Sequence, residues 1–172
     1  AAARGHRFGP LAVLVLIFLT LSFITRVTLL IMSWPNLELT FLRITGIFFI
    51  GLFYDIIVCS FLAIPVALYC WLMKDNWYQK KWQRIPLFFL FFLITLILVL
   101  NVGGEIIFWQ EFNVRYNFIA VDYLVYTTEV IGNIFESYNI PLIGSAVIVA
   151  SALILFSIRK KLTASMDVSM RF

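Results

Sequence analysis

The chain has 172 residues, of which 63% are hydrophobic and 13% are charged. Soluble domains carry about 45–50% apolar and about 25% charged residues, so the composition excludes a soluble domain and indicates an integral membrane protein. The net charge of +4 does not indicate nucleic-acid binding, because the basic residues are scattered among short segments between apolar runs. We therefore expect membrane lipids as partners and no nucleic acid.

The first two apolar runs are each long enough to cross a bilayer. They extend over about 8–32 and 41–73. About 20 apolar residues cross about 30 Å of hydrocarbon, so the second run must tilt, protrude or bend near Pro65. Nothing polar enough to turn the chain lies between its ends, which predicts one extended helix. Pro10 is suited to the first turn of the first helix, where a backbone N–H would be unpaired anyway.

Arg26 is the one charged residue inside the first run, and Asp55 lies deep inside the second, whose other charge, Arg43, is near its start. A carboxylate at that depth costs roughly 2.5–3.5 kcal/mol to insert, so Asp55 needs a partner. Arg26 either pairs with Asp55 or extends its charge to the outer interface. For Asp55 we favour a structural pair with Arg26, or a protonated and hydrogen-bonded carboxyl, over a proton or lipid-headgroup site.

Two further apolar runs extend over about 85–102 and 141–158, separated by a polar segment, 105–140. Gly103 and Gly104 follow the third run, and Arg159-Lys160-Lys161 ends the fourth. Ten of the thirteen Lys and Arg residues lie before the first run, between the second and third, or after the fourth. The positive-inside rule then predicts two cytoplasmic termini and an external 105–140 segment.

The external segment is predicted to contain an amphipathic helix. Five polar residues recur at spacings of four, three, four and three: Asp122, Tyr126, Glu129, Asn133 and Glu136. That stripe predicts a helix between Asn117, a candidate cap, and Pro141, lying on the outer membrane surface or packed under another domain. Before it, Glu111 and Arg115 are four residues apart and predicted to form an exposed pair.

The sequence contains no recognisable set of catalytic or metal-binding residues. Asp122, Glu129 and Glu136 are seven residues apart, about 10 Å along a helix, which is too far for two of them to bind one ion. His6 is the one histidine, and Cys59 and Cys70 are too far apart along one helix for a disulfide. We expect no catalytic residue, metal or cofactor in this chain.

Residues 111–141, EFNVRYNFIAVDYLVYTTEVIGNIFESYNIP, together with Gly51-Leu52-Phe53-Tyr54-Asp55, carry a family resemblance. They resemble bacterial lipoteichoic acid synthase-like proteins of the Gram-negative type, in the phosphoglycerol transferase group of the alkaline phosphatase/sulfatase superfamily. The resemblance implies that 1–172 is one amino-terminal membrane domain in the bacterial inner membrane. A fifth span and an extracytoplasmic catalytic domain with a threonine nucleophile and manganese or magnesium would follow, and are absent from this sequence.

The expected fold is therefore all-α, with four transmembrane helices and an interfacial helix on the outer face. The expected function is that of a membrane-anchoring, lipid-proximal domain of a phosphoglycerol- or phosphoethanolamine-type transferase. In it, seven residues of the 105–140 segment contact lipid or the catalytic domain: Glu111, Arg115, Asp122, Tyr126, Glu129, Asn133 and Glu136. The alternative is a stand-alone four-helix scaffold, sensor or small transporter in which Arg26 and Asp55 form an intramembrane switch.

Overall fold

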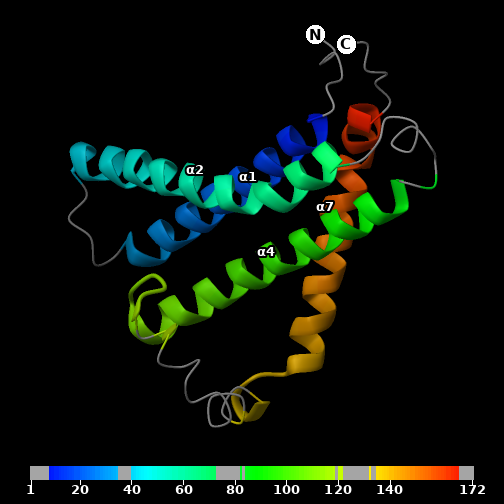
Figure 1. The fold of residues 1–172 in the computed structure, drawn as a ribbon. Coiled ribbons are helices and arrows are strands. Elements are labelled where there is room, and N and C mark those ends of the chain that lie inside the picture. Colours follow the sequence, from blue (N-terminus) through cyan, green and yellow to red (C-terminus); the bar gives the residue numbers. More distant parts are fainter. Residues whose placement is uncertain are drawn as a thin grey trace.

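The computed structural model describes residues 8–34, 40–72, 82, 84–118, 120–121, 132 and 135–166. Four long helices make up most of this part: α1 (Gly9–Ser33), α2 (Phe41–Leu72), α4 (Arg84–Phe112) and α7 (Ile140–Met166) (Figure 1). All four are long and apolar enough to cross a membrane. The described residues contain helices and no strand, which confirms the predicted all-α membrane class.

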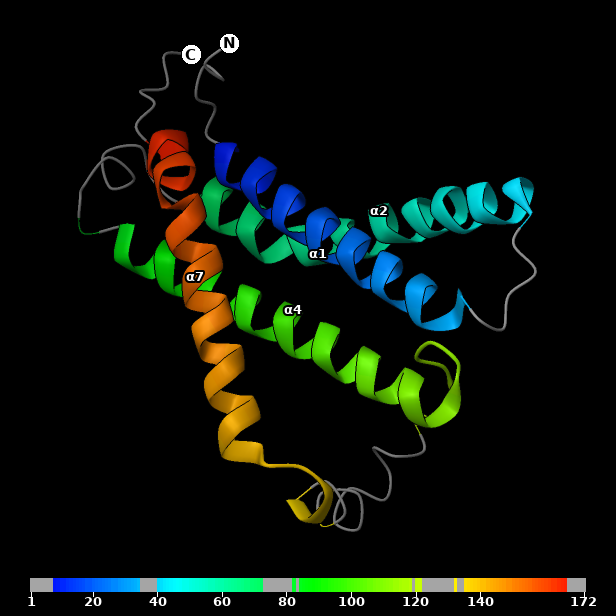
Figure 2. The same cartoon turned by 180° about the vertical axis from the view of Figure 1, so that it is seen from behind.

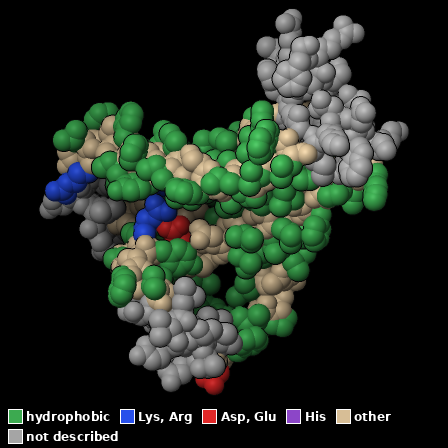
Figure 3. Space-filling model, viewed as in Figure 1, with side chains coloured by type: hydrophobic (Ala, Val, Ile, Leu, Met, Phe, Trp, Pro, Cys, Tyr) green, Lys and Arg blue, Asp and Glu red, His purple; other side chains and the backbone are tan. Residues whose placement is uncertain are grey.

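The first two helices begin and end close to the predicted positions. Pro10 lies in the first turn of α1, where it removes no helical hydrogen bond. Pro65 lies inside α2, which is assigned as one helix from Phe41 to Leu72 as predicted. Large apolar side chains cover the outside of the bundle, and Phe41 is 85% exposed (Figure 3). Such a surface is suited to lipid and not to water.

The last two helices are longer than predicted. We expected the third to end at 102, but α4 continues through Gly103 and Gly104 to Phe112. Glycine is frequent in membrane helices and does not by itself end one. We expected Arg159-Lys160-Lys161 to end the fourth, but α7 continues to Met166. Lysine and arginine are good helix formers, so a helix does not have to stop where the apolar run stops.

The apolar core lies at one end of the bundle. It combines the start of α1, the end of α2, the start of α4 and the end of α7, through Val13, Leu14, Ile17, Val66, Cys70, Leu87, Phe91, Ile94 and Leu162. Gly9 lies so close to Ser165 that the start of α1 and the end of α7 are neighbours. Towards the opposite end the helices diverge (Figures 1 and 2). Close packing at one end therefore leaves space between the helices at the other.

Candidate functional site

A cavity of about 990 Å³ lies at the end where the helices diverge. It is lined by the second half of α1, the first half of α2 and the second half of α4, and by Asn113, Arg115 and Tyr116. Charged side chains gather in a hollow of this face of the molecule (Figure 3). The polar lining comprises Ser22, Thr25, Arg26, Ser33, Tyr54, Asp55, Asn101, Glu105, Trp109, Asn113, Arg115 and Tyr116. We call this space the polar cavity.

Three of its charged residues belong to the transmembrane helices themselves. Arg26 lies seven residues before the end of α1 at Ser33, and Glu105 lies seven residues before the end of α4 at Phe112. At 1.5 Å per residue, each is about 10 Å from its helix end. Asp55 lies near the middle of α2. The polar cavity therefore carries charge below the ends of the helices, at a depth where unpaired charge is costly.

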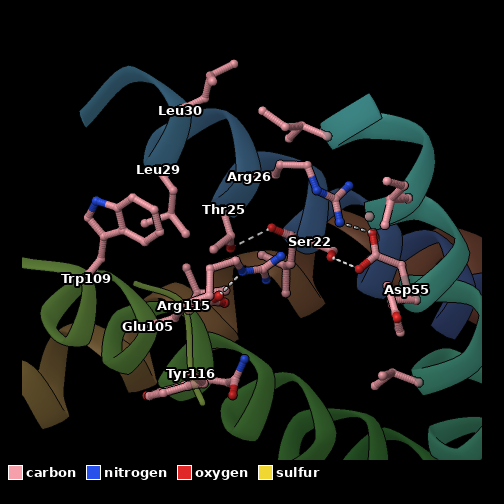
Figure 4. A pocket seen from close by; sticks show the side chains of 18 of the residues that line it. Ser22, Thr25, Arg26, Leu29, Leu30, Asp55, Glu105, Trp109, Arg115 and Tyr116 are labelled. Carbon is pink, nitrogen blue, oxygen red and sulfur yellow. Dashed lines mark hydrogen bonds and ion pairs between the residues drawn. The ribbon is translucent and has the colours of Figure 1, made fainter. Parts of the chain in front are cut away.

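Arg26 and Asp55 form the predicted ion pair between α1 and α2. Arg26 Nη2 donates to Asp55 Oδ2 at 2.7 Å, and Ser22 Oγ donates to Asp55 Oδ1 at 2.6 Å (Figure 4). Ser22 and Arg26 are four residues apart, so one face of α1 supplies both donors. Arg26 is 6% exposed and Asp55 is 8% exposed. The alternative in which Arg26 extends to the outer interface is therefore wrong.

Gly51 provides the space in which the Arg26 side chain lies. A Cβ atom at Gly51 would overlap the guanidinium group of Arg26. Gly51 and Asp55 are four residues apart and lie on the same face of α2. The GLFYD motif thus places an opening and a carboxylate side by side, and Arg26 uses both.

A second ion pair joins α4 to the residues that follow it. Arg115 Nε donates to Glu105 Oε1. We predicted Glu111 as the partner of Arg115; instead Arg115 contacts Glu105, and Glu111 is exposed. Glu105 is 5% exposed, so its carboxylate without a cation would cost more free energy than that of Glu111, which water solvates. The hydrogen bond to Glu105 raises the pKa of Arg115. Burial lowers this pKa, and the charges of Glu105 and Asp55 raise it further.

The chain reverses direction directly after α4. Asn113 has a φ of 53°, and its N–H donates to the Trp109 carbonyl at 2.8 Å, an arrangement typical of a left-handed helix cap. Tyr116 then packs on Phe108 with ring centroids 5.2 Å apart, and its hydroxyl lies where a Cβ of Gly104 would be. We call residues 113–116 the return segment.

The return segment places polar groups over the polar cavity. Burial is the larger of two effects that raise the pKa of Tyr116, and the charge of Glu105 is the smaller. The phenol of Tyr116 is therefore protonated at neutral pH. Arg115 contributes a guanidinium whose side chain is 48% exposed. The return segment therefore contributes both a hydrogen-bond donor and a cation to the lining of the cavity (Figure 4).

The described part of the chain supplies two cations and two carboxylates to the cavity, in two pairs. No group of three or more His, Cys, Asp or Glu residues suited to a metal ion occurs among the described residues. The arrangement is suited to binding: it presents charges of both signs, hydroxyl groups and the indole of Trp109 around one space.

Most of the predicted external helix lies outside the described residues. This holds for Asp122, Tyr126, Glu129 and Asn133. Residues 118, 120–121, 132 and 135–137 are helical, and Glu136 is exposed. Asn139 caps the start of α7, because its side-chain oxygen accepts from the N–H of Leu142 at 3.2 Å.

Our sequence predictions missed several residues of the site. The main ones are Ser22, Gly51, Glu105, Asn113 and Tyr116. A signal existed for Ser22, which precedes Arg26 by one helical turn, and for Gly51, which precedes Asp55 by one turn. Glu105 gave no such signal, because it follows two glycines that we read as the end of a helix.

Comparison with protein-family models, with curated proteins and with solved structures gave no match to this chain.

Proposed function

We propose that this chain is the membrane-anchoring, lipid-proximal domain of a phosphoglycerol- or phosphoethanolamine-type transferase at the outer face of the bacterial inner membrane. In this proposal the polar cavity receives the headgroup of the donor lipid. The observation that carries it is the cavity itself, a space among membrane helices lined by one buried ion pair and one partly exposed ion pair. The resemblance of residues 111–141 supplies the enzyme class.

The lining of the polar cavity fits an amphiphile. On α2 the carboxylate of Asp55 lies close in sequence to Ile47, Ile50 and Val58, three exposed apolar residues that line the same cavity. Headgroup and hydrocarbon could therefore be accommodated along one continuous surface. The volume of about 990 Å³ is at the upper end of the usual range for small-molecule sites, about 300–1,000 Å³.

The charge distribution supports an external location for the cavity. The cations cluster at the end where α1 begins and α7 ends, which by the positive-inside rule is cytoplasmic. The polar cavity is at the other end. In our proposal the chemistry, with its threonine nucleophile and manganese or magnesium, belongs to an extracytoplasmic catalytic domain, and this membrane domain presents the lipid to it.

Lipid turnover by the protein made from its complete reading frame tests the proposal. The protein is reconstituted with manganese in vesicles that contain fluorescent phosphatidylglycerol or phosphatidylethanolamine, and release of fluorescent diacylglycerol is measured. We expect release from at least one of the two lipids. Asn101→Leu, in the cavity, should slow it, whereas Ile97→Leu, one turn away and outside the lining, should not. Absence of diacylglycerol from both lipids would contradict the proposal.

The Arg26–Asp55 pair favours a second candidate function, a stand-alone sensor or small transporter with this pair as its switch. Ionisable residues inside membranes often mark proton pathways. In vesicles with an entrapped pH-sensitive dye, such a protein would carry a proton flux that Asp55→Asn abolishes. A wild-type protein with no flux would exclude the proton-transporter form of this alternative.

A further inference from the structure

We infer that the polar cavity selects a zwitterionic headgroup, one with a phosphate and a protonated primary amine, as in an aminophospholipid. In the selected complex the phosphate pairs with Arg26 and the ammonium pairs with Asp55, in place of the ion pair between these two residues. This inference rests on the proposed function insofar as it takes the cavity to be a lipid site. It adds the chemical class of lipid, which neither the fold nor the resemblance specifies.

The starting point is the balance of charge in the cavity. The charged lining residues of the described chain are Arg26, Asp55, Glu105 and Arg115, and their formal charges sum to zero. Each cation already contacts a carboxylate. A ligand that approaches Arg26 must therefore compete with Asp55, and one that approaches Glu105 must compete with Arg115.

A purely anionic headgroup is a poor competitor in this setting. Its phosphate would draw Arg26 away from Asp55 and leave a carboxylate that is 8% exposed without its cation. Breaking a buried pair from one side is strongly unfavourable, because the remaining charge is neither solvated nor paired. The same argument disfavours a purely cationic headgroup, which would leave Arg26 unpaired.

A zwitterionic headgroup satisfies both partners at once. Its phosphate takes over the Arg26 guanidinium, which now donates to Asp55 Oδ2, and its ammonium donates to the oxygens of Asp55 in place of Arg26. Both oxygens accept hydrogen bonds, from Ser22 Oγ and from Arg26 Nη2, and a primary ammonium has N–H groups to donate to them, whereas a quaternary methylated nitrogen has none.

The second ion pair repeats this arrangement with a cation that is more exposed. Arg115 is half-exposed, whereas Glu105 is buried. An entering phosphate therefore meets the Arg115 guanidinium first, and the amine can reach Glu105 behind it. Charges of alternating sign along the lining discriminate against lipids that carry one sign only.

Lipid binding measured by native mass spectrometry tests the inference. The detergent-purified protein from the complete reading frame is titrated with dioleoyl lipids that differ only in headgroup: phosphatidylethanolamine, phosphatidylglycerol, phosphatidic acid and phosphatidylcholine. We expect phosphatidylethanolamine to bind at least about tenfold more tightly than the other three. Equal affinities, or a preference for either anionic lipid or for phosphatidylcholine, would overturn the inference.

Free phosphoethanolamine separates the two possible sources of this chemistry. A lipid site should retain bound phosphatidylethanolamine when free phosphoethanolamine is added at the same concentration. Displacement of the lipid under that condition would overturn the lipid assignment and assign the cavity to a soluble zwitterion.

Variants locate the selectivity. The double variant Arg26→Leu/Asp55→Leu replaces the pair with apolar residues, so it avoids an unpaired buried charge. We expect it to keep a cooperative thermal transition and to lose the preference for phosphatidylethanolamine. Glu111→Gln, an exposed residue outside the cavity, should keep that preference. As a second variant, Ser22→Ala removes only one hydrogen bond to Asp55 and should reduce the preference without unfolding the protein.

Binding and turnover can fail independently. A protein that prefers phosphatidylethanolamine but releases no diacylglycerol would contradict the transferase and keep the zwitterion site. A protein that releases diacylglycerol and binds all four lipids equally would contradict the zwitterion site and keep the transferase.

Discussion

At the scale of single residues, Asp55 is held by two donors from one face of α1. Removing either member of the ion pair leaves a buried charge, whereas removing both leaves none. We therefore predict that Arg26→Leu or Asp55→Leu alone destabilises the protein by about 3–5 kcal/mol, and that the double variant is more stable than either. Denaturation in mixed micelles measures this. Additive effects of the two substitutions would show that the side chains are not coupled.

Gly51 matters because the Arg26 guanidinium lies against it. Gly51→Ala should displace that group and destabilise the protein by about 1–3 kcal/mol, as other additions to packed sites do. Gly46→Ala is the matched control, because it lines the same cavity on the same helix and nothing lies within 4 Å of its added Cβ. The same denaturation assay compares the two. Equal effects of the two substitutions would contradict this role for Gly51.

The two ion pairs were not equally predictable from the sequence. Arg26 is the one charge in its apolar run and Asp55 is the one charge away from the ends of its own, and the cost of charge in hydrocarbon is large enough to indicate their pairing. The pair of Glu105 and Arg115 depends on the left-handed turn at Asn113, which shows no comparable pattern in sequence. The spacing of four residues between Glu111 and Arg115 favoured Glu111 as the partner of Arg115. The burial of Glu105 makes Glu105 the partner instead.

At the scale of elements, α4 and the return segment act together. Gly103 and Gly104 looked like the end of a membrane helix, yet Gly104 lies inside α4 and provides space for the Tyr116 hydroxyl. Without a side chain at Gly104, Tyr116 packs on Phe108, which keeps Arg115 next to Glu105. The function of that glycine depends on a contact twelve residues away and could not be predicted from local sequence.

Substitution of the two neighbouring glycines separates this contact from a general effect on the helix. Gly104→Ala should displace Tyr116 and speed amide hydrogen exchange over residues 113–118. Gly103→Ala should not, because nothing lies within 4 Å of its added Cβ. Exchange is followed by mass spectrometry in detergent. Unchanged exchange in Gly104→Ala would contradict the proposed packing of the return segment.

At the scale of the whole molecule, the bundle has a closed apolar end and an open polar end. The number of long helices and the all-α class followed from hydropathy, because bilayer thickness imposes a minimum length on each apolar run. Hydropathy did not predict that the helices diverge towards one end of the bundle. Each helix is apolar nearly all round, so no stripe in the sequence marks which faces meet and where they separate.

The proposed topology predicts which positions reagents can reach from outside the cell. Cys59 and Cys70 are both buried and would first be replaced by alanine. A membrane-impermeant maleimide should then label a cysteine at Glu136 in intact cells, and should label one at Ala164 only after the membrane is opened. Both positions are exposed in the structure. Labelling of Ala164→Cys in intact cells would reverse the topology and place the polar cavity on the cytoplasmic side.

The most direct test of a lipid headgroup in the polar cavity is photo-crosslinking from the protein to lipid. A benzophenone amino acid replaces Asn101, which lines the cavity, or Ile97, which is exposed one turn earlier on α4 and does not line it. After irradiation in native membranes, mass spectrometry of the adducts locates the attached carbon. We predict headgroup attachment at position 101 and acyl-chain attachment at position 97. Acyl-chain attachment alone at both positions would contradict a headgroup site in the polar cavity.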